Sequence, residues 1–122
     1  MSAVTTHVLD AARGAPAAGV AIRLEAAKGG EDPLAGSSID TAWASIASGR
    51  TDDDGRIKDL GPDRLDAGDY RLTFETGEYF DSQGVATFYP QVQIAFRITD
   101  PAQHYHVPLL LSPFAYSTYR GS

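Results

Sequence analysis

Three stretches of the chain alternate apolar and polar residues with a period of two, which is typical of a β-strand with one buried face. These stretches are residues 19–25, 69–75 and 92–98. A strand places every second side chain on the same side, so one face of each stretch should lie in a hydrophobic core. The apolar positions expected there are Val20, Ile22, Leu24, Tyr70, Leu72, Phe74, Val92, Ile94, Phe96 and Ile98.

Both ends of the chain also predict β-strands. Residues 4–10 are rich in β-forming residues, and a glycine and a proline follow shortly after them. Residues 104–122 predict two strands joined by a turn at Ser112 and Pro113. We therefore expect strands at the two extremes of the sequence as well as in its middle.

The middle of the chain contains three less regular segments. Residues 41–50 fit either a strand or a short helix, while residues 78–84, which have a glycine at either boundary, predict one short helix. Residues 28–40 are rich in Gly, Asp, Pro and Ser and predict a surface loop. Several short strands separated by turns, with one helix, predict an all-β fold of the β-sandwich class, and 122 residues fit one domain.

The chain is acidic, with a formal net charge of -6 and an isoelectric point near 4.8. This balance argues against binding to nucleic acid or to an anionic membrane, since both attract clustered Lys and Arg. No apolar run approaches the roughly 20 residues of a membrane-spanning helix. No secretory signal or peroxisomal Ser-Lys-Leu ending is visible, so we expect a cytoplasmic protein. The absence of cysteine excludes disulfides and thiolate metal sites.

Three histidines are the first candidates for chemistry. His104 and His106 lie two apart on one predicted strand, so their imidazoles should share a face. His7 lies in the first predicted strand, where Thr5 and Leu9 share its face. Such histidines can simply be solvated on an edge strand. They also fit a three-histidine zinc site, although the spacing alone does not require one, or acid–base catalysis, since the imidazole pKa lies near neutrality.

Two further polar residues stand close to predicted turns or to the C-terminus. Arg56 follows the turn-forming run Thr-Asp-Asp-Asp-Gly, and Tyr119 opens the final run Tyr-Arg-Gly-Ser. Taken singly, each is typical of a surface residue. The sequence shows no Ser-His-Asp or Cys nucleophile pattern, so a hydrolytic reaction here would use direct attack by water.

Three runs of sequence together carry a resemblance. They are HYHVPLLLSPFAYSTYRGS at residues 104–122, TTHVLD at 5–10 with PAAGV at 16–20, and TDDDGR at 51–56. These runs resemble the 5-hydroxyisourate hydrolases, the transthyretin-related enzymes of purine degradation. Transthyretin, the related hormone carrier, shares the fold but lacks the Tyr-Arg-Gly-Ser ending. The resemblance covers nearly the whole chain and implies a transthyretin-like β-sandwich of two antiparallel sheets with one short helix, forming a single hydrolase domain over residues 1–122.

The resemblance also implies an activity and the residues that perform it. These enzymes hydrolyse 5-hydroxyisourate to 2-oxo-4-hydroxy-4-carboxy-5-ureidoimidazoline in urate degradation, and we expect no cofactor and no metal. The catalytic residues it implies are His7, Arg56 and His106. The substrate-binding residues it implies are His104, Tyr119 and Ser122. Opening a lactam ring needs a base for water and a stabiliser for the oxyanion, which histidine and arginine can supply.

A site on the outer face of one sandwich would need further subunits to enclose it, and two other functions also fit such a fold. One small sandwich cannot easily enclose a site on the solvent-facing side of its strands, and the resemblance implies a homotetramer, a dimer of dimers, with sites in a channel between facing sheets. The first alternative is a transthyretin-like carrier without catalysis, which would favour small or apolar residues in place of His106 and Tyr119. The second is a non-catalytic β-sandwich module, which leaves the histidines unexplained.

Overall fold

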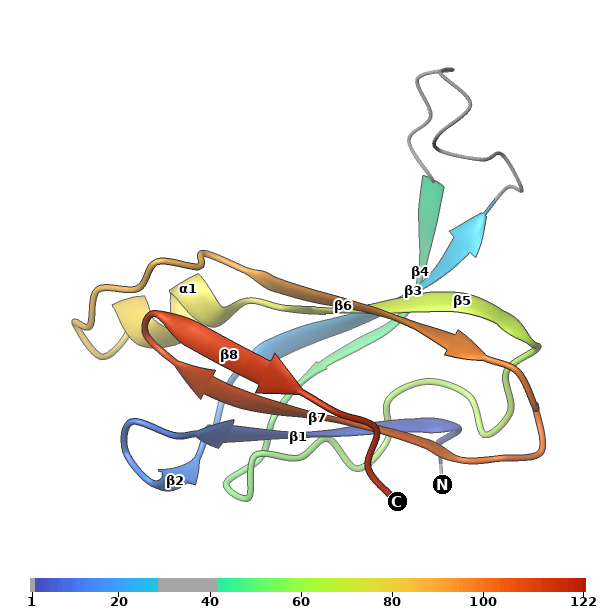
Figure 1. Cartoon of the computed structure of the whole chain (residues 1–122), viewed down its shortest axis with the longest axis horizontal. Coiled ribbons are helices and arrows are strands. Elements are labelled where there is room, and N and C mark those ends of the chain that lie inside the picture. Colours follow the sequence, from blue (N-terminus) through green and yellow to red (C-terminus); the bar gives the residue numbers. More distant parts are fainter. Residues whose placement is uncertain (1, 29–41) are drawn as a thin grey trace.

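Two four-stranded β-sheets pack face to face and enclose the hydrophobic core (Figure 1). The computed structural model describes residues 2–28 and 42–122. The strand order is β2-β1-β7-β8 in the first sheet and β4-β3-β5-β6 in the second. The elements are β1 (Val4–Asp10), β2 (Ala15–Pro16), β3 (Ala21–Lys28), β4 (Ala42–Arg50), β5 (Gly68–Phe74), α1 (Thr76–Asp81), β6 (Val92–Ile98), β7 (Tyr105–Ser112) and β8 (Ala115–Thr118).

The first sheet contains a parallel pair of strands. Strand β1 runs parallel to β7, with Val4 opposite Tyr105 and Asp10 opposite Leu111, whereas the other paired strands are antiparallel. The predicted β-sandwich is confirmed, and the expectation of purely antiparallel sheets needs this one correction. Parallel neighbours cannot be joined by a tight hairpin. Here the chain that connects them passes through the whole second sheet, and local sequence patterns do not reveal such a pairing.

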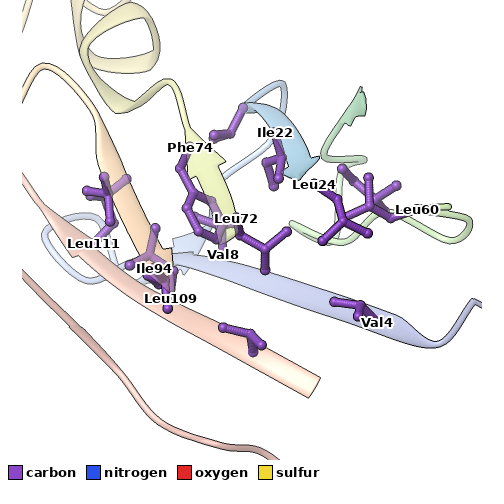
Figure 2. Close-up of a cluster of buried hydrophobic side chains, with 14 of the residues drawn as sticks. Val4, Val8, Ile22, Leu24, Leu60, Leu72, Phe74, Ile94, Leu109 and Leu111 are labelled. Carbon is purple, nitrogen blue, oxygen red and sulfur yellow. The ribbon is translucent and has the colours of Figure 1, made fainter. Parts of the chain in front are cut away.

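The core lies between the two sheets and is filled by the alternating apolar positions. Figure 2 shows side chains of both sheets meeting there, among them Val4, Val8, Leu109 and Leu111 from the first sheet and Ile22, Leu24, Leu72, Phe74 and Ile94 from the second. All apolar residues predicted from the alternation are buried except Phe96, which is half-buried on the edge strand β6 beside Tyr70. Each fully buried Leu or Phe side chain contributes roughly 1.5–3 kcal/mol.

Helix α1 begins and ends earlier than the sequence predicts. It covers Thr76–Asp81 instead of residues 78–84. Gly77 lies in the first turn of the helix and does not bound it, because its N–H donates to the carbonyl of Pro90 at 2.9 Å. A Cβ at this position would press on the main chain of Pro90, so the glycine permits a close approach of two backbones. Gly84 lies in a turn beyond the helix, with a φ of 69°.

The other irregular segments are settled by pairing with their neighbours. Of the segment 41–50, which fits a strand or a helix, residues 42–50 form β4 beside β3, with a register shift between Leu24 and Glu25. The predicted loop at 28–40 lies outside the described residues, apart from Lys28, the last residue of β3. In the part of the chain that the structure describes, no helix has the length and apolar character needed to cross a membrane.

A buried ion pair reinforces the outer face of the second sheet. Glu25 of β3 is only 6% exposed. Its carboxylate accepts hydrogen bonds from Nε and Nη2 of Arg71 at 3.1 and 3.0 Å and from the Thr73 hydroxyl at 2.8 Å. The Trp43 ring covers the Arg71 guanidinium, whose Cζ lies 4.4 Å from the ring centroid. The bond from Arg71 is the main reason why the pKa of Glu25 lies below its ordinary value.

We expect Glu25→Gln to destabilise the protein by roughly 3 kcal/mol, because it leaves the largely buried Arg71 without its counter-charge. The pair stabilises the fold above the pKa of an unfolded glutamate, and this contribution is lost as the pH falls through the lower folded-state pKa. The variant should therefore lose less stability on acidification than the wild type. Urea unfolding at neutral and acidic pH measures both effects.

Asp69→Asn is the matched control for this prediction. Asp69 pairs with Arg97 on the surface, where the two side chains are 48% and 72% exposed. Solvent screens such a pair, so its loss should cost much less stability. Equal losses in the two variants would contradict the conclusion that the Glu25 pair is shielded.

Candidate active site

The parallel pairing of β1 with β7 places Thr5 opposite His106. The hydroxyl oxygen of Thr5 lies 2.8 Å from Nδ1 of His106 and 3.1 Å from Nε2 of His104. Both imidazoles therefore lie on the same side of the sheet, as their spacing predicts, although His104 stands one residue before β7 begins. Thr5 is the residue that joins them.

His7 is held by the turn that follows β4. Its Nε2 lies 2.8 Å from the carbonyl oxygen of Asp54. Because a carbonyl only accepts hydrogen bonds, this Nε2 carries hydrogen, and the lone pair of a neutral His7 is left on Nδ1. The main chains of His7 and Arg56 also pair in an isolated β-bridge. This bridge places Arg56 directly beside β1.

The turn itself depends on Asp52 and Gly55. A carboxylate oxygen of Asp52 accepts hydrogen bonds from the main-chain N–H groups of Asp54 at 2.9 Å and Arg56 at 3.0 Å, and the bond from Arg56 is the main cause of the lowered pKa of Asp52. Gly55 has a φ of 77°, and a Cβ there would overlap the carbonyl oxygen of Val8. The Gly55 carbonyl accepts from the Val8 N–H at 2.8 Å. Arg56 is thus aimed by main-chain contacts between the turn and β1.

These segments surround a hollow of about 370 Å³. The polar and charged residues that line it include Thr5, Asp52, Asp54, Arg56, Lys58, His104, His106 and Ser122. Arg56 is exposed and forms no ion pair with any residue that the structure describes. Its planar set of donors is therefore available to a carbonyl or an anionic group in the hollow.

His106 has a lowered pKa. Burial is the largest cause, and the positive charge of Arg56, followed by the neighbouring His104 and His7, acts in the same direction. A hydrogen bond to the main chain of Thr5 acts weakly against them. The imidazole therefore stays neutral at neutral pH, which is the state in which it can accept a proton.

The residues after β8 cover the main chain of His106. The N–H of Gly121 donates to the His106 carbonyl at 2.9 Å, and the two residues form an isolated β-bridge. A Cβ on Gly121 would overlap the His106 ring, so a glycine is needed for this close approach. This contact carries the next residue, Ser122, into the lining of the hollow.

Tyr119 lies apart from the other predicted site residues. Its side chain is 59% exposed and borders a second hollow, of about 420 Å³, that opens beside β6. The neighbouring Arg120 packs over the ring of Tyr105, with Cζ 4.5 Å from the centroid. His106 borders both hollows, so it lies between Tyr119 and Arg56.

The structure thus gathers His104, His106, Arg56 and Ser122 around one hollow, with His7 attached through Asp54. Thr5 and Lys58 also line this hollow, although no sequence pattern pointed to either of them. The register between β1 and β7 places Thr5 opposite His106. Local periodicity does not predict this register, so it could not identify Thr5. Within residues 2–28 and 42–122, no three His, Asp or Glu side chains are placed to hold a metal ion, so the three-histidine zinc alternative gains no support.

Residues 4–121 match the HIUase/Transthyretin family. The chain belongs to this family. It is 46% identical over 120 residues to the 5-hydroxyisourate hydrolase of Salmonella typhimurium. This match covers 98% of this chain and 80% of the relative. The solved 5-hydroxyisourate hydrolase of Klebsiella pneumoniae superposes with a TM-score of 0.78 at 36% identity and 98% coverage of both chains. Transthyretin from Sparus aurata superposes with a TM-score of 0.84 at 31% identity, covering 99% of this chain and 97% of that one.

Membership of the HIUase/Transthyretin family confirms the predicted transthyretin-like sandwich. The fold alone does not separate a hydrolase from a transthyretin, because a solved 5-hydroxyisourate hydrolase and a solved transthyretin both superpose on this chain over nearly its whole length. The distinction must come from the side chains in the hollow, since function depends on the site and not on the fold.

We expect Gly121→Ala to displace the His106 ring or to lift the last residues away from β7, because the added Cβ and the ring cannot occupy the same space. Histidine side-chain NMR signals of His106 should shift, while thermal unfolding should change little. Ser117→Ala, in the exposed edge strand β8, is the control and should leave the His106 signals in place. Unchanged His106 signals in the Gly121 variant would contradict the close packing of Gly121 against the His106 ring.

Proposed function

We propose that this chain is a 5-hydroxyisourate hydrolase that converts its substrate to 2-oxo-4-hydroxy-4-carboxy-5-ureidoimidazoline. The observation that carries this proposal is the hollow that His106, whose pKa is lowered, shares with Arg56, which forms no ion pair with a described residue. The name of the Salmonella relative, at 46% identity, supports the same activity. A carrier without catalysis would need neither the His106 imidazole nor the Arg56 guanidinium. The carrier function therefore ranks second.

In the proposed reaction His106 acts as the general base. It takes a proton from a water molecule while the water oxygen bonds to the carbonyl carbon of the lactam. The carbon–nitrogen bond of the ring then breaks, and the leaving nitrogen receives a proton. One water molecule is added overall, and no covalent intermediate with the protein is needed.

Arg56 stabilises the negative charge that develops on the carbonyl oxygen. A guanidinium offers two parallel N–H donors, and no ion pair with a described residue competes for them. His7 is the second proton-transfer group. Because its Nε2–H is committed to the Asp54 carbonyl, Nδ1 is the atom that can exchange a proton.

His104, Tyr119 and Ser122 are the proposed substrate-binding residues. His104 and Ser122 line the hollow with Arg56, whereas Tyr119 reaches the substrate only if the two hollows beside His106 are joined. All three side chains are exposed in a single chain. A facing subunit would exclude the water that now reaches them.

The proposal therefore includes a homotetramer, a dimer of dimers, built from one domain spanning residues 1–122. Strands β6 and β8 lie at the edges of their sheets, where a second copy can pair with free main-chain groups. We place this enzyme in the cytoplasm, without cofactor or metal. Light scattering that finds an active monomer would remove the tetramer from the proposal.

Ultraviolet spectroscopy tests the activity directly. We expect the purified protein to accelerate the decay of 5-hydroxyisourate freshly generated from urate by urate oxidase, relative to its decay in buffer. Pretreatment with a chelator should change nothing. A decay no faster than in buffer would refute the proposed function, whereas activity lost on chelation and restored by zinc would refute the metal-free mechanism.

The roles of the catalytic residues predict distinct kinetic effects. His106→Ala and His7→Ala should each lower kcat by roughly 10²–10⁴-fold, the usual range for losing a general acid or base. Arg56→Lys should not restore wild-type turnover, because an ammonium group cannot reproduce the planar pair of donors. Arg50→Lys, at an exposed ion pair with Glu78 and outside the lining of the hollow, is the matched control and should retain activity. Near-normal turnover in any of the first three variants removes that residue from the mechanism.

A further inference from the structure

We propose that Thr5 is a positioning residue that keeps the hydrogen of neutral His106 on Nδ1, so that Nε2 presents its lone pair to the hollow. The catalytic consequence rests on the proposed function, whereas the tautomer itself can be measured without it. The starting observation is the hydroxyl oxygen of Thr5, which lies 2.8 Å from Nδ1 of His106 and 3.1 Å from Nε2 of His104.

The number of hydrogens on the hydroxyl limits the arrangements at this junction. A threonine hydroxyl has one hydrogen to donate and two lone pairs to accept. It can donate to only one of the two imidazoles, so at least one ring must donate to it. His106 is the nearer of the two rings, and we assign its Nδ1 as the donor.

The resulting chain of hydrogen bonds satisfies all three groups. Nδ1–H of His106 donates to the Thr5 hydroxyl, and the hydroxyl donates to Nε2 of His104. In this arrangement the His106 nitrogen that faces Thr5 is a donor with an acceptor as its partner, and the His104 nitrogen is an acceptor with a donor as its partner. On His106, the only nitrogen left with a lone pair is Nε2, which is the atom that a general base must offer to water.

A hydroxyl fixes this tautomer without adding charge. In a Ser-His-Asp triad the carboxylate holds the imidazole through the same ring atom and also stabilises the imidazolium. A carboxylate in place of Thr5 would raise the pKa of His106, since a nearby negative charge favours the protonated ring. Thr5 carries no negative charge, so it does not counteract the lowering of the His106 pKa by burial and by Arg56. His106 is therefore both oriented and neutral.

The neighbouring threonine provides a matched comparison. Thr6 points to the opposite side of β1, where its hydroxyl donates to the Val107 carbonyl at 2.6 Å and is buried. The two threonines share a strand and a chemistry, but only the Thr5 hydroxyl contacts a histidine ring among the described residues. Thr5→Val and Thr6→Val each remove one threonine hydroxyl, but only Thr5→Val also removes a contact with a histidine ring. Comparing the two variants therefore separates these effects.

The test is ¹⁵N NMR of histidine-labelled protein at a pH where His106 is neutral. In the wild type we expect the Nδ1 shift of a protonated nitrogen and the Nε2 shift of an unprotonated one. Thr5→Val keeps the shape of the side chain but removes the hydroxyl, so the hydrogen should move largely to Nε2. Thr5→Ser should keep the wild-type pattern, and Thr6→Val should leave the His106 shifts unchanged.

Steady-state kinetics on 5-hydroxyisourate supply the second readout. Thr5→Val should lower kcat on the order of 10²-fold, towards the lower end of the range for loss of a general base, because the reactive lone pair is no longer presented. KM should change little, since Thr5 acts through His106, and Thr5→Ser should recover most of the turnover.

Several results would overturn the proposal. One is a wild-type spectrum with the hydrogen on Nε2 of His106, and another is a Thr5→Val spectrum that keeps it on Nδ1. Equal losses of kcat in Thr5→Val and Thr5→Ser would also reject it. If the wild type shows the expected tautomer but no activity on 5-hydroxyisourate, the proposed function fails while the positioning role of Thr5 stands.

Discussion

The pairing of β1 with β7 is the constraint on which both the core and the candidate site depend. On one face of this pair, Val4 and Val8 of β1 and Leu109 and Leu111 of β7 all enter the core, with Val8 opposite Leu109 (Figure 2). A shift of register by a single residue would move every side chain of a strand to the opposite face. It would expose these apolar residues and push imidazoles into the core, so hydrophobic burial enforces the geometry of the polar face. The site is precise because the core behind it tolerates no alternative.

The turn at residues 51–56 shows how an apparently solvated segment can organise chemistry. Asp52 is an acidic residue beside two other aspartates, and its carboxylate closes the turn by accepting two main-chain hydrogen bonds. The same turn presents the carbonyl that fixes His7 and the main chain that positions Arg56. In a protein with a net charge of -6, a guanidinium that pairs with no carboxylate in the described part of the chain is thereby placed where the histidines gather. Its charge also helps to keep His106 neutral.

Local sequence patterns were enough to predict most of the strands, the core and the shared face of His104 and His106, but they left β4 open between strand and helix and gave no sign of β2. The features that they missed all depend on contacts between distant segments. Gly77 reads as a helix boundary, yet it sits inside α1 because the main chain of Pro90 packs against it. Thr5 gains its contact with His106 from a parallel register that periodicity cannot specify. Tyr119 belongs to a sequence motif of the hydrolases, but in a single chain it borders a different hollow from Arg56.

The distance in sequence between Thr5 and His106, 101 positions, bears on how the molecule folds. Bringing such remote segments together requires closing a very long loop, and contacts of this kind form late when nearer pairings are available. In the second sheet, β5 pairs with β3 and β6, whereas the first sheet is complete only when the two extremes of the chain meet (Figure 1). A refolding chain would thus regain much of its secondary structure before it regains catalytic activity. No intermediate that lacks the final strands can contain a working site, so turnover reports the last step of assembly.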